Sequence, residues 1–135
     1  MRFSSRVLPA TIALFSALPC QAANFDGSKP FLCASIDIAS CAPGEDCSRE
    51  TATSANVPQF FMVDLQKKTV TNADADGERR TSAIEHVEHM SPLLVLGGND
   101  GQLAWVATIS ETGKMSVSAV GDQVSFVVFG SCIIP

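Results

Sequence analysis

The segment from residue 82 to residue 132 alternates between apolar and polar positions and is interrupted by short turn signals. Residues 102–110 show the pattern most clearly. Leu103, Trp105, Ala107 and Ile109 would share one face, because successive side chains of a strand point to opposite faces. The pattern therefore predicts a half-buried strand at this position.

The neighbouring residues repeat this alternation. Met115, Val117 and Ala119 would lie on one face of the next strand. The connections are two to four residues long, too short for a crossover helix, so neighbouring strands should pair antiparallel. We expect eight strands, at residues 31–39, 58–65, 68–72, 79–89, 92–98, 102–110, 114–120 and 124–131.

Eight consecutive strands predict an all-β domain built as a small antiparallel meander. An up-and-down, calycin-like barrel would close such a meander and remove its exposed edges. A two-sheet sandwich is the alternative arrangement. A barrel of this size can be filled by side chains or can hold one small apolar ligand.

Residues 81–90 fit two interpretations. Ser82 and Glu85 would form a capping box, which predicts a helix of about two turns. A strand would instead supply the pairing partner that residues 93–98 need, with Ser91 and Pro92 in the turn. We favour the strand.

The first 23 residues predict a secretory signal peptide. Arg2 and Arg6 precede an apolar run at residues 7–18, and small residues near Ala22 suit signal peptidase. The apolar run is too short to span a bilayer comfortably, so we expect no transmembrane segment in the mature protein. Residues 24–135 would form one domain, exported to the periplasm or the extracellular space.

The charge of the mature chain limits its partners. Removing Arg2 and Arg6 leaves seven basic residues against fourteen acidic ones, a net charge of −7. Such a surface is a poor partner for nucleic acid. The chain has no Tyr and one Trp, whereas many protein-binding surfaces rely on exposed aromatic side chains.

Four cysteines remain in the mature chain, and an even number in an exported protein predicts two disulfides. Cys41 and Cys47 flank a short loop with a Pro-Gly turn, so we expect them to pair. Cys33 would then join Cys132 and connect the first strand to the last. The loop between Cys41 and Cys47 is also our expected contact region for a protein partner.

Two segments carry candidate metal ligands. Asn72, Asp74 and Asp76 match the first positions of a calcium loop, but position twelve lacks the required Glu, so an acidic hairpin turn is the favoured interpretation. His86 and His89 would share a face on a helix and could hold a metal ion. On a strand they would point to opposite sides.

Sequence motifs of catalysis are missing: the chain has no Gly-x-Ser-x-Gly elbow and no complete phosphate-binding loop. Asp37 and Asp64 interrupt apolar strands, and we expect each to lie outward or to pair with a basic residue. We therefore expect no enzymatic activity and no cofactor, with Ca²⁺ as the alternative.

In size and expected export, the chain resembles small calycin-type periplasmic barrels, a group that includes lysozyme inhibitors and metalloprotease inhibitors. The lysozyme-inhibitor families carry a loop with Ser-Gly and Tyr residues, and this chain has no Tyr, so the resemblance is architectural and assigns no functional residue. We expect a non-enzymatic binding protein whose partner is a protein, as for an inhibitor, or a small apolar ligand. A calcium- or metal-binding β module is the alternative.

Overall fold

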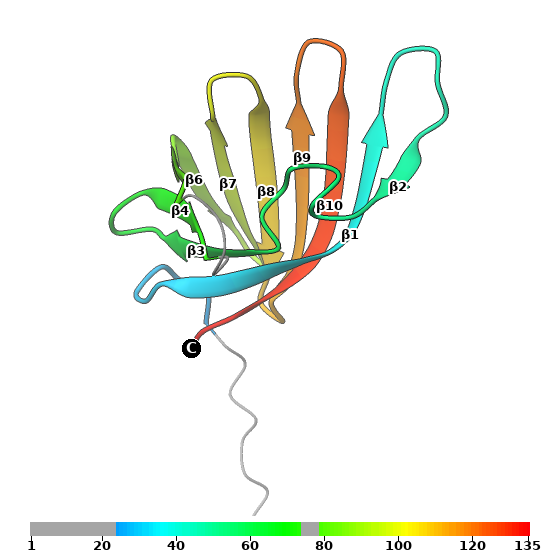
Figure 1. Cartoon of the computed structure of the whole chain (residues 1–135). Helices are drawn as coiled ribbons and strands as arrows, with labels where there is room; N and C mark the ends of the chain where they lie inside the picture. The colour runs from blue at the N-terminus through cyan, green and yellow to red at the C-terminus, as the bar shows by residue number, and fades with distance from the viewer. Residues whose placement is uncertain (1–23, 74–78) are drawn as a thin grey trace, which may run out of the picture.

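The computed structural model of the chain describes residues 24–73 and 79–135. These residues contain no helix and form ten strands of one antiparallel sheet (Figure 1). The strands are β1 (Phe31–Cys41), β2 (Ser48–Glu50), β3 (Phe60–Asp64), β4 (Thr69–Asn72), β5 (Thr81–Ala83), β6 (His86–Met90), β7 (Leu93–Asn99), β8 (Ala104–Ser110), β9 (Lys114–Val120) and β10 (Ser125–Ile133). The all-β prediction is confirmed.

The strands follow the order β5-β4-β3-β1-β10-β9-β8-β7-β6, with β2 paired to β1 beside this path. Consecutive strands therefore pair from β3 to β5 and from β6 to β10, as in a meander, and the first long strand also pairs with the last. The sheet curls into a half-barrel (Figure 1). Strands β5 and β6 lie at the two ends of the path, so hydrogen-bonded pairing does not run around a full circle.

One predicted strand, at residues 79–89, is divided in two. The backbone N–H of Ile84 donates to the carbonyl oxygen of Lys68 at 2.9 Å, on the β4 side. The next residue, Glu85, donates to Gly97 at 2.8 Å, on the β7 side. The chain thus passes from one end of the curled sheet to the other at these two residues, and the helical interpretation is wrong.

A β-bulge explains the irregular alternation of β1. The register between β1 and β10 shifts between Ser35 and Asp37. An extra residue in a strand reverses the facing of the residues that follow it. Ile36 is therefore 72% exposed while Ile38 is 3% exposed, although a regular strand would place the two on the same face.

The segment at residues 41–56, which lies outside the eight expected strands, contains the short strand β2. Arg49 of β2 pairs with Ala39 of β1, so the two strands form a hairpin. The disulfide between Cys41 and Cys47 joins the two sides of this hairpin near its tip. The segment is a loop only at the tip and after β2.

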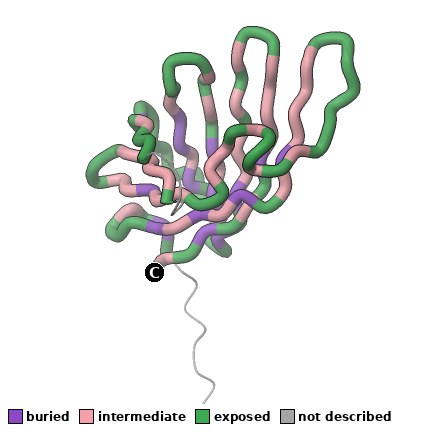
Figure 2. Tube along the Cα trace, in the orientation of Figure 1, coloured by how far each residue is buried: buried purple, intermediate pink, exposed green. Residues whose placement is uncertain are grey.

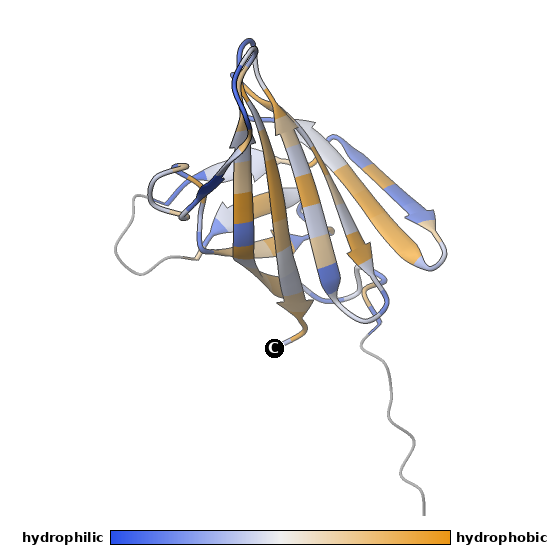
Figure 3. Cartoon of the chain, turned by 90° about the vertical axis from the view of Figure 1, so that its right-hand side faces the viewer, coloured by the Kyte–Doolittle hydropathy of each residue, from blue (hydrophilic) through white to orange (hydrophobic). Residues whose placement is uncertain are grey.

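The core lies where the strands converge. The largest fully buried side chains include Phe31, Val63, Leu96 and Ile109, each exposed by 1% or less. Figure 2 shows buried segments gathered toward this end and exposed hairpin tips at the other. Figure 3 shows apolar and polar residues alternating along the strands, as the sequence pattern predicts.

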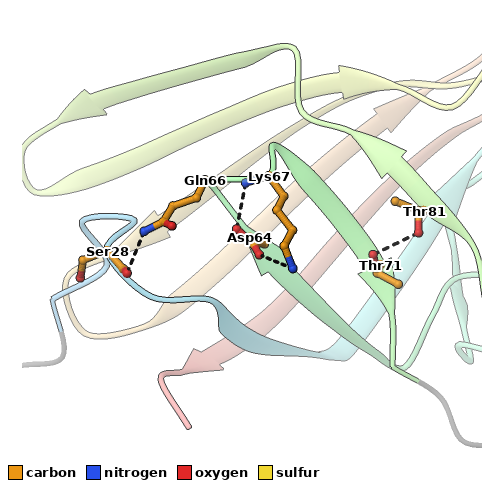
Figure 4. A network of polar contacts seen from close by, with 6 residues as sticks. All are labelled: Ser28, Asp64, Gln66, Lys67, Thr71 and Thr81. Atoms are coloured by element: carbon orange, nitrogen blue, oxygen red, sulfur yellow. Dashed lines mark hydrogen bonds and ion pairs between the residues drawn. The ribbon is translucent and has the colours of Figure 1, made fainter.

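The turn after β3 ties the start of the domain to the sheet (Figure 4). Gln66 donates from Nε2 to the carbonyl oxygen of Ser28 at 3.1 Å. Within the turn, the backbone N–H of Lys67 donates to Asp64 Oδ1 at 3.0 Å, and Lys67 Nζ lies 3.5 Å from Asp64 Oδ2. The N-terminal segment is thereby held against the convergent end of the half-barrel.

Candidate functional site

The concave face of the half-barrel surrounds an open cavity of about 590 Å³. Every second residue of successive strands lines it, because alternate side chains of a strand share one face. The inner faces predicted for β8 and β9 are confirmed. The apolar lining includes Leu103, Trp105, Ala107 and Ile109 of β8 and the turn before it, Met115, Val117 and Ala119 of β9, and Val124, Phe126 and Val128 at β10.

The cavity is closed at one end and open at the other. At the closed end, Leu96 and Ile109 are each 1% exposed. Phe25 packs edge-on against Phe31 there, with ring centroids 5.2 Å apart. The half-buried ring of Trp105 lies nearer the hairpin tips, where the strands spread apart (Figure 1). An apolar molecule would therefore enter between the hairpin tips.

Residues 51–59, which we call the strap, connect β2 to β3 across the concave face (Figure 1). Its side chains Ala52, Ala55 and Val57 pack against the core. The backbone N–H of Val57 donates to Ala52 at 2.9 Å, which keeps the strap in a compact turn. The strap supplies part of the cavity wall opposite the sheet.

Both ends of the strap are anchored. The buried hydroxyl of Ser35 donates to the carbonyl oxygen of Pro58 at 2.9 Å, and its backbone N–H donates to Gln59 at 2.9 Å. At the other end, the Ser54 hydroxyl donates to Glu50 Oε2 at 2.6 Å. This hydrogen bond, with another from Ser40, lowers the pKa of Glu50.

Polar side chains gather at the mouth of the cavity, and we call them the rim: Asn56, Asn72, Arg80, Asp100 and Gln102. Arg80 Nη2 donates to Asn56 Oδ1 at 3.0 Å. The carboxylate of Asp100 accepts a hydrogen bond at 3.0 Å from the backbone N–H of Leu103 in its own turn. The cavity thus combines an apolar wall with a few polar groups at one end.

This arrangement suits the enclosure of an amphipathic molecule. Among the described lining residues, the charged side chains are Arg80 and Asp100, both at the rim. The rest of the lining is mostly apolar. Its polar groups are the Ser35 hydroxyl, which is engaged by the strap, the Ser82 hydroxyl and the indole N–H of Trp105. An apolar chain would contact the wall while its polar end would reach the rim.

The cysteine predictions are confirmed in full. Cys33 is bonded to Cys132, and Cys41 is bonded to Cys47. Cys33 and Cys132 lie directly opposite each other in the β1–β10 pairing. The first disulfide therefore lies at the convergent end of the half-barrel, and the second lies at a hairpin tip.

The structure separates the two candidate histidines. His86 and His89 lie on β6, where an odd spacing places side chains on opposite faces. Among the described residues, no group of three or more His, Cys, Asp or Glu side chains is arranged to hold a metal ion. A metal site at these histidines stays a prediction of the sequence alone.

The candidate calcium turn falls partly outside the described residues, because Asp74 and Asp76 belong to the segment 74–78. Asn72 is described, and its Oδ1 accepts a hydrogen bond from the backbone N–H of Arg80 at 2.7 Å. Ca²⁺ binding at this turn stays a prediction. The expected signal peptide, at residues 1–23, also lies outside the described part of the chain.

The two aspartates within strands have the ordinary partners that the sequence predicts. Arg49 Nη1 lies 2.8 Å and 3.1 Å from the two carboxylate oxygens of Asp37. The backbone N–H of Lys67 lowers the pKa of Asp64, and the Lys67 ammonium contributes. Both aspartates are therefore paired with basic residues.

Sequence analysis missed the contribution of the strap and of the rim. Residues 51–57 of the strap lay outside the eight expected strands, and Arg80 was not considered. One signal was available, because Ala52, Ala55 and Val57 place apolar residues at short intervals within a polar segment. Such spacing indicates a turn with one buried side, but it does not identify the surface that the turn covers.

A second, smaller cavity of about 130 Å³ lies at the convergent end, lined in part by Phe25, Asp26, His89 and Pro92. Hydrogen bonds from Ser28 hold the pKa of Asp26 below its usual range. The volume is well below the roughly 300–1,000 Å³ of typical ligand sites. The concave cavity is therefore the better candidate site.

Comparison with known protein families, with characterised proteins and with solved structures finds no match to this chain. The part of the chain that the structure describes has no helix with the length and apolar character needed to cross a membrane. The geometry of the cavity is therefore the basis for proposing a function.

Proposed function

We propose that this protein is a non-enzymatic binding protein that holds one small apolar molecule in its concave cavity. The observation that supports this most directly is the cavity itself, of about 590 Å³. This volume lies within the roughly 300–1,000 Å³ of small-molecule sites, which are mostly apolar and carry a few polar groups. The half-barrel and its rim have both features.

Two disulfides indicate an oxidising, non-cytoplasmic environment. We propose that the signal peptide directs the chain to the periplasm or outside the cell. A binding protein in either compartment would meet apolar molecules that are poorly soluble in water. The half-barrel would shield such a molecule while leaving its polar end at the rim.

The test is a titration of the disulfide-bonded mature protein with N-phenyl-1-naphthylamine, a neutral dye that fluoresces in apolar surroundings. We expect saturable binding of one dye per chain. The single tryptophan, Trp105, lines the cavity, so its fluorescence should change with the same midpoint. Dye fluorescence that rises without saturation would contradict the proposal.

A pair of matched variants locates the binding site. Ala119→Phe places a ring inside the cavity, next to Trp105, its pairing partner in the sheet. Ala104→Phe makes the same change at an exposed position of β8 that does not line the cavity. We expect Ala119→Phe to weaken dye binding by about tenfold and Ala104→Phe to leave it unchanged, since a bulky side chain excludes ligand only where it fills the site.

A further inference from the structure

Arg80 is the one positively charged side chain among the described residues that line the cavity. Its Nη2 contacts a neutral amide oxygen, that of Asn56, at 3.0 Å. Among the described residues, the ion pairs join Arg49 to Asp37 and Lys67 to Asp64, and neither pair involves Arg80. A guanidinium group has five N–H donors in a planar arrangement, so donors remain for a ligand.

The position of Arg80 is set by the sheet. Its backbone N–H donates to Asn72 Oδ1 at 2.7 Å, and its carbonyl oxygen accepts from the Asn72 backbone N–H at 3.0 Å. This two-way contact holds Arg80 beside the end of β4. Asn56 is also held in place, within the strap and with a positive φ of 52°. A cation fixed at the mouth of an apolar cavity is preorganised for an anion.

The opposite charge at the rim is already engaged. Asp100 Oδ1 accepts hydrogen bonds from the backbone N–H groups of Leu103 at 3.0 Å and Gln102 at 3.4 Å. Its role is to stabilise the β7–β8 turn. The rim therefore offers a ligand one cation, the Arg80 guanidinium.

Resting on the proposed function, we infer that the ligand is a single-chain amphiphile with an anionic head group, a carboxylate or a phosphate. The head group binds the Arg80 guanidinium, in a charge-assisted hydrogen bond stronger than a neutral one. The hydrocarbon chain extends past Trp105 toward the buried side chains of Leu96 and Ile109.

The test compares laurate with dodecanol, which have the same chain length and differ in head-group charge. Binding to the disulfide-bonded mature protein is followed by the fluorescence of Trp105. We expect Arg80→Gln to weaken laurate binding by about tenfold or more, as the loss of a hydrogen bond to a charged group does. Dodecanol binding should change little.

Arg79→Gln is the matched control, because Arg79 is an exposed neighbour that does not line the cavity. This variant removes the same charge from the same region. It should leave the Kd for laurate within about twofold of the wild-type value, since the field of an exposed charge outside the site is screened by solvent. If Arg79→Gln weakens laurate binding as much as Arg80→Gln does, the loss is a general charge effect, and the assignment of the head group to Arg80 is overturned.

Two further measurements test the inference if Arg80→Gln does not fold or if the site binds small anions. If Arg80→Gln does not fold, Arg80→Lys and the wild-type protein serve instead: the wild type must prefer laurate to dodecanol, and the lysine variant must retain that preference. Acetate and inorganic phosphate at the same concentrations should not displace laurate. Displacement by either would assign the site to a free anion.

The outcomes separate the inference from the proposed function. Equal binding of laurate and dodecanol by the wild-type protein overturns the anionic head group and leaves a neutral apolar ligand. Absence of binding for laurate, dodecanol and the neutral dye overturns the proposed function itself. Loss of laurate binding in Arg80→Gln, with dodecanol binding retained, supports both.

Discussion

The two ends of the half-barrel are built from the same alternating pattern and differ in how completely they are packed. At the packed end, around Phe31, Leu96 and Ile109, side chains from the curled sheet meet and exclude water. At the open end, around Trp105 and Phe126, equally apolar side chains line the cavity and stay partly exposed. The difference shows that apolar alternation identifies the inner face of a strand. It does not determine whether side chains fill the space that this face encloses.

The two ends differ in packing because the strands converge at one end and spread apart at the other. The β1–β10 disulfide and the ring of Phe25 occupy the packed end, where the strands converge. The hairpin tips spread at the open end, and the strap covers only part of the space between them (Figure 1). Substitutions at the two ends should therefore have unequal effects on stability.

The largest expected effect distinguishes the two disulfides. Replacing Cys33 and Cys132 by Ala should lower the free energy of unfolding by about 4–5 kcal/mol, because the bond closes a loop of 99 residues. Replacing Cys41 and Cys47, six residues apart, should cost about 2 kcal/mol. Urea unfolding measures both, and equal losses would contradict the structural ranking of the two bonds.

Matched leucine truncations test the packing of the two ends directly. Leu96→Ala removes a side chain that is 1% exposed and should cost about 3 kcal/mol or more, because it leaves a void. Leu103→Ala acts on a half-buried side chain at the cavity mouth and should cost about 1 kcal/mol. If Leu103→Ala is as destabilising as Leu96→Ala, the open end is packed in solution.

Enlarging a side chain at each end tests the difference in packing by the opposite kind of substitution. A Cβ at Gly130 would contact the carbonyl oxygen of Ala34 and lie 2.6 Å from Met115 Cε. Gly130→Ala should therefore cost about 1–3 kcal/mol. Ala119→Phe enters open space and should change the stability by less than about 1 kcal/mol. Thermal unfolding of both variants gives the comparison, and a similar loss in both would show that the cavity is occupied by side chains.

The smallest effects concern two half-buried carboxylates, each at the end of a strand. Asp64 has its pKa lowered by the Lys67 backbone N–H, and Glu50 has its pKa lowered by the Ser54 hydroxyl. A pKa lowered on folding adds stability above the unfolded pKa, and this stability is lost as the pH falls through the folded pKa. Asp64→Asn and Glu50→Gln should therefore each be less stable than wild type at neutral pH.

Urea unfolding at about pH 7 and about pH 2.5 measures this difference, which should shrink at the acidic pH as the wild-type carboxylates become protonated. Asp64 ends β3 and accepts a hydrogen bond from the turn that follows it, whereas Glu50 anchors the strap. Only Glu50→Gln should also weaken binding of the neutral dye, because it loosens the cavity wall. A difference in stability that grows on acidification would contradict the assigned hydrogen bonds.

The sequence was informative wherever a local pattern specifies structure. Alternation at Leu103–Ile109 identified the inner face, the short connections identified antiparallel neighbours, and the spacing of Cys41 and Cys47 identified their pairing. Each of these signals lies within a few residues of chain. Cys33 and Cys132 then had only each other as partners, although they are 99 residues apart.

Predictions were less accurate where one residue changed the direction of the chain. The bulge after Ser35 moved Ile38 to the inside, and the crossing at Ile84 and Glu85 divided one expected strand into β5 and β6. The eight expected strands became ten for this reason and because β2 was unforeseen. Bulges and crossings depend on pairing partners that are distant in sequence, so local periodicity does not reveal them.

The amino-acid sequence by itself determined the all-β class, the inward-facing residues of β8 and β9 and the disulfides, because these follow from spacing along the chain. Tertiary structure alone decided that the inner face encloses a cavity, that the strap covers part of it, and that Arg80 meets Asn56 at its rim. These features depend on how strongly the sheet curls. Curvature arises from many small contributions of twist and packing, and no single stretch of sequence encodes it.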